Sequence, residues 1–142
     1  MSESVYLDTN VLVYAIENHP EYGASCKKIL QDIQDNKLRT SASIQVLAEL
    51  VNVLVKLNKV LGKEKIKLNI QENIEAVLSL PIVWLELNFT TILKATEYTY
   101  AINGADYIHL ASMEIHGIKK ILSADSDFDK PSEIKRINPL EY

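Results

Sequence analysis

A short apolar strand that stops at a carboxylate is the sequence feature that most restricts how this chain can fold. Residues 5–7 are apolar or aromatic, Asp8 follows at once, and polar Thr9 and Asn10 precede an apolar helical pattern. In open α/β sheets, ligands bind in the crevice at the carboxyl ends of the strands. This arrangement therefore predicts an α/β fold in which Asp8 faces a binding site.

The rest of the chain alternates between short apolar runs and helical patterns. The predicted strands cover residues 5–8, 38–41, 82–85, 120–123 and 133–137, and the predicted helices cover residues 11–16, 21–36, 44–61, 63–80, 89–100 and 105–116. We expect Ser43 to cap the third helix, and Gly62 and Gly117 to end the helices that precede them. This alternation predicts a three-layer α/β/α sandwich with a central, mainly parallel sheet.

Length and composition favour one ordinary globular domain. The chain has 142 residues, enough for a core of its own, and we expect a single domain over residues 1–142. No apolar run approaches the roughly 20 residues that span a bilayer, and no secretory signal pattern is visible. Cys26 is the only cysteine, which excludes an internal disulfide and a cysteine-based zinc site. These features lead us to expect a cytoplasmic protein with no membrane partner.

Three further acidic positions have settings as specific as that of Asp8. Glu49 lies in a helical pattern whose neighbours are nearly all apolar. We therefore expect a largely buried helix, in which a carboxylate needs a partner or a metal. Asp106 stands in the first turn of a predicted helix, and the pair Asp125 and Asp127 follows the last core strand. If the fold is parallel, these acids gather at one edge of the sheet.

Each acid also has a purely structural interpretation. Glu49 can reach solvent or pair with a lysine, and the helix macrodipole alone favours an acid at Asp106. Aspartates after a strand often bond local backbone amides, which is the interpretation that we prefer for Asp129. Asp125 is nearest the strand end and is assigned to the site, whereas the choice between Asp125 and Asp127 as the fourth acid stays open.

A cluster of three or four carboxylates favours one kind of chemistry. Such groups repel one another at neutral pH unless a cation neutralises them. Oxygen-only ligands select Mg²⁺ or Mn²⁺ over zinc, and such an ion activates water and stabilises charge on a phosphoryl oxygen. The residues therefore imply metal-dependent hydrolysis of a phosphodiester. No glycine-rich phosphate loop, nucleophile elbow or Cys–His pairing supports another reaction.

The charge pattern bears on the substrate. The net charge of −4 argues against a protein that binds nucleic acid by bulk basicity. Residues 56–67 nevertheless hold five lysines against one acid, and Lys56 and Lys59 are candidate RNA contacts, although a solvated helix junction is the interpretation that we favour. His109 lies one turn after Asp106, where it could contact RNA or tune a carboxylate; a packing role is favoured.

Taken in order, these motifs resemble the PIN-domain family of nucleases, in particular the VapC-type toxins of prokaryotic toxin–antitoxin pairs. The segments that carry the resemblance are residues 7–12, 43–52, 105–106 and 123–128. The family's last motif often has threonine where this chain has Ser123, a departure that keeps the hydroxyl. By resemblance, the metal-binding and catalytic acids are Asp8, Glu49, Asp106 and Asp125, with Asp127 as a further metal ligand and with Asn10 and Ser123 orienting the cluster by hydrogen bonds.

The resemblance also implies an activity and partners. Members of this family bind Mg²⁺ or Mn²⁺, cleave RNA and commonly form homodimers, and VapC-type members are held inactive by an antitoxin that reaches into the active-site groove. We therefore expect a metal-dependent endoribonuclease that is the toxin of a type II toxin–antitoxin system. The alternatives are an RNA-processing or structure-specific nuclease of the same fold, and a module that binds RNA or protein without cleaving. The retention of all four acids speaks against the last alternative.

Overall fold

The structure is a computed structural model that describes residues 3–61 and 67–142. Its centre is a five-stranded parallel sheet in the order β3-β2-β1-β4-β5. The strands are β1 (Val5–Leu7), β2 (Thr40–Ser43), β3 (Val83–Leu85), β4 (Lys120–Leu122) and β5 (Lys135–Ile137). The helices are α1 (Thr9–Ile16), α2 (Gly23–Gln34), α3 (Ile44–Leu61), α4 (Ile70–Ser79), α5 (Phe89–Ala95) and α6 (Gly104–Ile115), with short 3₁₀ turns η1 (Ser126–Asp129) and η2 (Pro139–Glu141).

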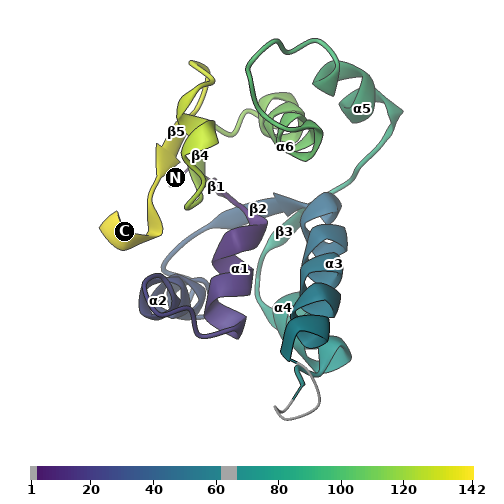
Figure 1. The fold of residues 1–142 in the computed structure, drawn as a ribbon. Helices are drawn as coiled ribbons and strands as arrows, with labels where there is room; N and C mark the ends of the chain where they lie inside the picture. The colour runs from purple at the N-terminus through teal and green to yellow at the C-terminus, as the bar shows by residue number, and fades with distance from the viewer. Residues whose placement is uncertain (1–2, 62–66) are drawn as a thin grey trace.

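The helices lie in two layers, one on each face of the sheet. Figure 1 shows α1 to α4 on one side of the strands and α6, with α5 packed on it, on the other. The predicted three-layer α/β/α sandwich with a parallel sheet is confirmed. None of the helices in the described part of the chain is long and apolar enough to cross a membrane.

The strand order locates the crevice of the sheet. From β1 the chain moves outward to β2 and β3, then crosses back to β4 on the other side of β1 and continues to β5. The order of the strands therefore reverses between β1 and β4. In open α/β sheets, the crevice at such a reversal, outside the carboxyl ends of the strands, is where ligands bind.

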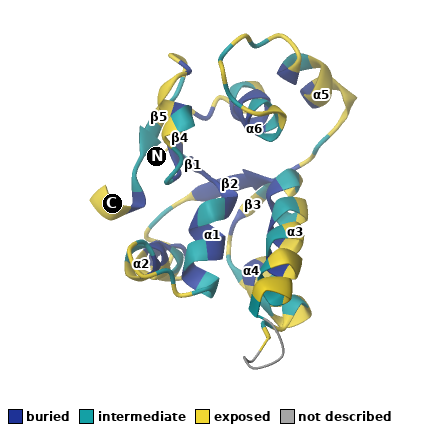
Figure 2. Ribbon diagram, in the orientation of Figure 1, coloured by how far each residue is buried: buried dark blue, intermediate teal, exposed yellow. Residues whose placement is uncertain are grey.

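The core is centred on β1, the middle strand of the sheet. Tyr6 pairs in register with Ser41 on one side and Ile121 on the other, and all three residues of β1 are buried. Figure 2 shows this buried centre, with more exposed residues on the outer helices and at the C-terminal end. Strands buried on both faces read as continuous apolar runs, which is why β1 and β4 are visible in the sequence.

Helix α3 differs from its prediction. We expected a largely buried helix, but only Val46, Leu50 and Leu54 are buried along it. Val51 and Val60 project away from the protein. Among the described residues the helix contacts α1, α4, β2 and α6, and these contacts leave Val51 and Val60 exposed.

Side-chain caps explain where several helices begin. Asn69, Asn88 and Asn103 each accept a hydrogen bond from the backbone three residues ahead, which satisfies an otherwise free amide. Gly117 adopts a left-handed conformation (φ +67°) and ends α6 as predicted. The predicted end of α3 at Gly62 and the predicted helix start at residue 63 lie outside the described residues.

Element boundaries are where the predictions differ most. Strand β2 begins at Thr40 rather than 38, because the amides of Lys37 and Leu38 still bond the Asp32 carbonyl at the end of α2. Helix α5 ends at Ala95 rather than 100, and the Thr96 hydroxyl bonds back to the Leu93 carbonyl at that point. These local hydrogen bonds compete with the regular pattern, and hydrophobic periodicity does not show them.

Candidate metal centre

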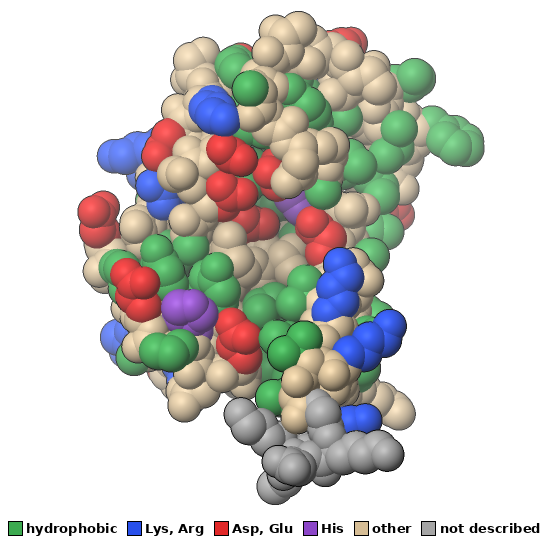
Figure 3. Space-filling view, viewed as in Figure 1, with side chains coloured by type: hydrophobic (Ala, Val, Ile, Leu, Met, Phe, Trp, Pro, Cys, Tyr) green, Lys and Arg blue, Asp and Glu red, His purple; other side chains and the backbone are tan. Residues whose placement is uncertain are grey.

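Four carboxylates that are distant in sequence meet in one cleft. Asp8, Glu49, Asp106 and Asp125 line a hollow of about 310 Å³, together with Thr9, Asn10, Val13, Tyr14 and Val53. Figure 3 shows acidic side chains gathered on this face between β4, α6 and the start of α3. The cleft lies at the reversal of strand order, where the fold is expected to bind a ligand.

Each acid lies either after a strand that ends at this edge of the sheet or near the start of a helix that begins there. Asp8 follows β1 and caps α1, and Asp125 follows β4 and caps η1. In crossovers between parallel strands, the helices run back against the strands, so their first turns lie at the carboxyl edge. Asp106 in the first turn of α6 and Glu49 in the second turn of α3 reach the cleft for this reason.

Hydrogen bonds hold Asp8 rigidly. Its Oδ1 accepts from the Thr9 amide at 2.8 Å. Its Oδ2 accepts from the Ser123 hydroxyl at 2.6 Å and from the Asn10 side-chain amide at 3.1 Å. Asn10 also joins Ser123 and the Ala124 amide, so it connects the ends of β1 and β4. The two positions expected to orient the cluster, Asn10 and Ser123, therefore both contact its first acid.

Glu49 is held by residues from two other helices. Its Oε1 accepts from the Thr9 hydroxyl at 2.9 Å and lies 2.5 Å from His109 Nε2. On the other side of the ring, His109 Nδ1 is 2.7 Å from the Tyr6 hydroxyl. His109 is fully buried, which leaves no part of its side chain exposed for direct contact with RNA. It contacts the Glu49 carboxylate, as in the other functional role considered for it, and it is packed between helices as favoured.

The acids after β4 have different surroundings. The Asp125 amide bonds the Ser123 hydroxyl at 3.0 Å, which directs the segment toward the cleft. Asp127 has a carboxylate oxygen close enough to Asp106 and Asp125 to share a metal, all within 4.8 Å of one another, but it also pairs with Lys130 at 3.0 Å. Asp125 also lines the cleft, and the choice between the two as the fourth acid stays a prediction. Asp129 accepts hydrogen bonds from the Arg136 side chain rather than from local backbone amides, so its role is structural but differs from the one preferred for it.

Burial, together with the like charges nearby, disturbs the ionisation of two of the acids. Burial, followed by the charges of Asp8 and Asp125, raises the pKa of Asp106 from 3.8 to about 7. Burial also raises the pKa of Asp8, although His109 and the hydrogen bond from Ser123 act against it. Without a cation, the cleft therefore resists full ionisation.

Glu49 and His109 stabilise one another's charge. Burial alone would raise the pKa of Glu49, but the hydrogen bond and charge of His109, with the hydrogen bond from Thr9, hold that pKa below its ordinary value. Burial opposes the charged imidazole, yet Glu49, Asp8 and Asp106 together raise the pKa of His109. Glu49 is consequently an ionised carboxylate at neutral pH.

The donor set fits a hard divalent cation. Oδ2 of Asp106 is buried and has no hydrogen-bond partner among the described residues. A buried carboxylate oxygen without a partner is costly unless something positively charged meets it. All the candidate ligands are carboxylate oxygens, the kind that Mg²⁺ and Mn²⁺ prefer.

The candidate RNA contacts lie beside the cleft rather than in it. Lys56 and Lys59 are exposed on α3, the helix that carries Glu49. Figure 3 shows basic side chains further along α3 than its acidic end. Their role stays a prediction.

Thr9 and Tyr6 were missed as site residues, although a tyrosine in an otherwise apolar strand signals a hydroxyl that needs a buried partner.

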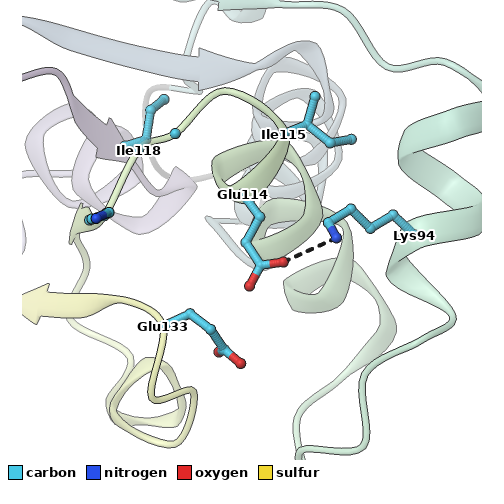
Figure 4. Close-up of a pocket in the computed structure, with 7 residues that line it drawn as sticks. Lys94, Glu114, Ile115, Ile118 and Glu133 are labelled. Carbon is cyan, nitrogen blue, oxygen red and sulfur yellow. Dashed lines mark ion pairs between the residues drawn. The ribbon is translucent and has the colours of Figure 1, made fainter.

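A larger cavity elsewhere lacks these properties. It has a volume of about 570 Å³ and is lined by Lys94, Glu114, Glu133 and apolar residues near the end of α6 (Figure 4). Its acids are already bonded: Glu114 pairs with Lys94 at 3.2 Å, and Glu133 accepts from the Tyr100 hydroxyl. The chemistry of the protein is therefore assigned to the smaller acidic cleft.

Comparison with known proteins agrees with this geometry. A family model of the PIN domain matches residues 5–134. The chain belongs to the PIN domain family. No curated protein sequence matches this PIN domain.

Solved structures share its fold at low sequence identity. VapBC2 from Rickettsia felis, bound to a DNA fragment from its promoter, is 20% identical over 94% of this chain and 97% of its own, with a TM-score of 0.67. VapC20 from Mycobacterium tuberculosis, described as a Sarcin-Ricin loop cleaving toxin, is 18% identical over 89% and 93%, also with a TM-score of 0.67. FitAcB from Neisseria gonorrhoeae is 19% identical over 97% and 99%, with a TM-score of 0.61. This PIN domain therefore has the fold of VapC toxins.

Proposed function

We propose that this PIN domain is a divalent-metal-dependent endoribonuclease and the toxin of a type II toxin–antitoxin system. The observation that carries the proposal is the meeting of Asp8, Glu49, Asp106 and Asp125 in one cleft, with a buried oxygen of Asp106 left without a partner. A module that only binds RNA or protein gains nothing from four carboxylates that repel one another. A cation-dependent hydrolase can use such a set to hold its ion.

The four acids would hold Mg²⁺ or Mn²⁺, and Asp127 is close enough to Asp106 and Asp125 to take part. When bound, the ion supplies a water of lowered pKa and neutralises charge that develops on a phosphoryl oxygen. Hydrolysis forms a bond between the water oxygen and phosphorus, breaks the bond to the leaving oxygen and returns a proton to that oxygen. Asn10 and Ser123 contribute by holding Asp8 in place.

RNA is the proposed substrate. Two features support it: the description of one structural neighbour as a Sarcin-Ricin loop cleaving toxin, and the exposed lysines Lys56 and Lys59 on the helix beside the cleft. Lysines there can hold the backbone of a polyanion that would otherwise be repelled by the acids.

A cognate antitoxin is the proposed protein partner. One structural neighbour, from Klebsiella pneumoniae, is described as a toxin–antitoxin complex; it is 16% identical over 98% of this chain, with a TM-score of 0.68. The cleft joins its acids to apolar Val13 and Val53. A segment that blocks it would therefore carry a basic side chain for the acids and apolar side chains for this wall. A homodimer and a cytoplasmic location are part of the same proposal.

The test is cleavage of RNA by the purified protein. We expect cleavage with Mg²⁺ or Mn²⁺, loss of cleavage in EDTA, and a loss of at least about 100-fold in Asp8→Asn and in Asp106→Asn. Glu86→Gln is the matched control because Glu86 is an exposed acid outside the cleft.

The outcomes separate the candidate functions. Cleavage that survives EDTA, or equal cleavage by the wild type and both cleft variants, would overturn the assignment. Cleavage of structured DNA but not RNA would favour a structure-specific nuclease. Metal binding and RNA binding without any cleavage would favour a non-cleaving module.

A further inference from the structure

A buried chain of hydrogen bonds runs from the sheet to the metal-binding cleft. It passes from the Ser43 amide to the Tyr6 hydroxyl (3.1 Å), then to His109 (2.7 Å) and then to Glu49 (2.5 Å). We propose that His109 is a positioning residue, which fixes the Glu49 carboxylate for the cation, and that Tyr6 fixes the His109 ring. This inference rests on the proposed metal-dependent function. It adds two residues that support the metal centre without contacting the substrate.

The direction of each hydrogen bond is determined by what its partners can donate. The Ser43 amide can only donate, so Tyr6 Oη accepts from it. The Glu49 carboxylate is ionised and can only accept, so the nitrogen that faces it, Nε2 of His109, carries a proton. This holds whether the ring is neutral or charged, because both forms can have a proton on Nε2.

The geometry leaves one oxygen of Glu49 available. Both of its hydrogen bonds, from the Thr9 hydroxyl and from His109, end on Oε1. Oε2 has no hydrogen bond among the described residues, and Glu49 lines the cleft. Two donors from separate helices thus restrain a flexible side chain on its first oxygen while the second remains free to coordinate a cation.

His109 itself has no freedom to move. Its side chain is 0% exposed, and both of its ring nitrogens have partners. These two partners fix the orientation of the ring, because any other orientation would leave a buried nitrogen unpaired. It lies one turn after Asp106 on α6, so a single helix provides one acid and orients another. Partners of this kind commonly alter metal affinity by about 10- to 100-fold when they are removed.

Two substitutions at one position separate orientation from packing. His109→Gln places an amide nitrogen near the site of Nε2 and can still donate to Glu49. His109→Asn places its amide near Nδ1, so it can contact Tyr6 but cannot reach Glu49. Tyr6→Phe keeps the ring in β1 and removes only the hydroxyl that holds His109. Near-ultraviolet circular dichroism and urea unfolding identify variants that keep the native fold.

The readout is the affinity of metal-free protein for Mn²⁺, measured by isothermal titration calorimetry, so it does not depend on cleavage. We expect His109→Asn to bind Mn²⁺ about 10- to 100-fold more weakly and His109→Gln to bind nearly as well as the wild type. Tyr6→Phe should fall between them. The same order is expected for RNA cleavage at subsaturating Mn²⁺, with recovery at high Mn²⁺.

Each alternative result is distinct. If folded His109→Asn or Tyr6→Phe binds Mn²⁺ with wild-type affinity, the positioning role is refuted while the metal centre stands. If Gln and Asn at position 109 weaken binding equally, the ring acts through packing and the inference is also wrong. If the wild type itself does not bind Mn²⁺, the proposed function fails first, and this inference fails with it.

Discussion

Removal of the Asp106 charge should stabilise the metal-free protein although it abolishes the proposed activity. In the folded chain, the pKa of Asp106 is raised to about 7 from 3.8, and its buried Oδ2 has no partner among the described residues. Ionised Asp106 therefore opposes folding at neutral pH. The substitution Asp106→Asn keeps the shape of the side chain, removes the repulsion from Asp8 and Asp125, and adds an amide that can donate to them.

The sign of the pH dependence follows from proton binding. The unfolded chain has an ordinary Asp106 carboxyl, which is ionised throughout the range from pH 6 to pH 8. The folded chain takes up a proton on Asp106 as the pH falls through about 7. A proton bound only by the folded state stabilises it, so the wild type should become more stable as the pH falls from 8 to 6.

The magnitude can be worked out from the same value. A carboxyl with a pKa of about 7 goes from about one tenth protonated at pH 8 to about nine tenths protonated at pH 6. This proton uptake raises the free energy of unfolding by about 1.4 kcal/mol. Because Asp106 borders an open cleft, we reduce this contribution to about 1 kcal/mol. At pH 8, Asp106→Asn should raise the free energy of unfolding of the metal-free protein by about 1–2 kcal/mol.

Urea unfolding in EDTA at pH 6, 7 and 8 measures these differences. Asp8 and His109 also have raised pKa values, which add to the pH dependence of the wild type. The quantity to compare is therefore the change in the free energy of unfolding between pH 8 and pH 6 for the wild type, minus the same change for Asp106→Asn. Glu86→Gln should behave as the wild type. Mn²⁺ should stabilise the wild type and not Asp106→Asn. A variant that is less stable than the wild type at pH 8 in EDTA, or equal pH trends in both, would refute this reasoning.

Two further predictions concern other parts of the chain. Lys56→Glu combined with Lys59→Glu should weaken RNA binding and reduce the slope of log affinity against log salt by roughly 1–2. The control Lys37→Glu, at the opposite end of β2 from α3, should leave both unchanged. Fluorescence anisotropy between about 50 and 200 mM salt measures the affinity, and an unchanged slope in the double variant would exclude these lysines as contacts. Tyr142→Phe removes a hydroxyl that donates to Asp32 at 2.6 Å. Urea unfolding should show that the free energy of unfolding falls by about 1 kcal/mol, while RNA cleavage is unchanged. A loss of cleavage would mean that Tyr142 affects the site.

The positions of the acids were predictable because the fold class and the chemistry constrain one another. A carboxylate directly after an apolar strand, such as Asp8, or within a few residues of its end, such as Asp125, lies at the carboxyl edge of a parallel sheet. Acids near the start of the intervening helices reach the same edge, which places Asp106 in a first turn and Glu49 in a second turn. None of these inferences requires the exact boundary of a strand or helix.

The hydrogen bonds within the site were not predictable in the same way. Tyr6, Thr9 and His109 come from two adjoining segments and a distant helix, and their contacts with one another or with Glu49 depend on how α1, α3 and α6 cross. Periodicity indicates which face of a helix is apolar, but not which polar atom on a second helix lies opposite. The same limit explains why α3 was expected to be buried on more faces than it is.

The wide sequence separation of the four acids affects the synthesis of the protein. Asp8 and Glu49 are made before Asp125 and the strand that positions it. A nascent chain therefore lacks a complete site until Asp125 has been made and all four segments can fold together. For an enzyme proposed to cut RNA, this order delays the onset of activity while the first acids are already synthesised beside the RNA-rich particle that makes them.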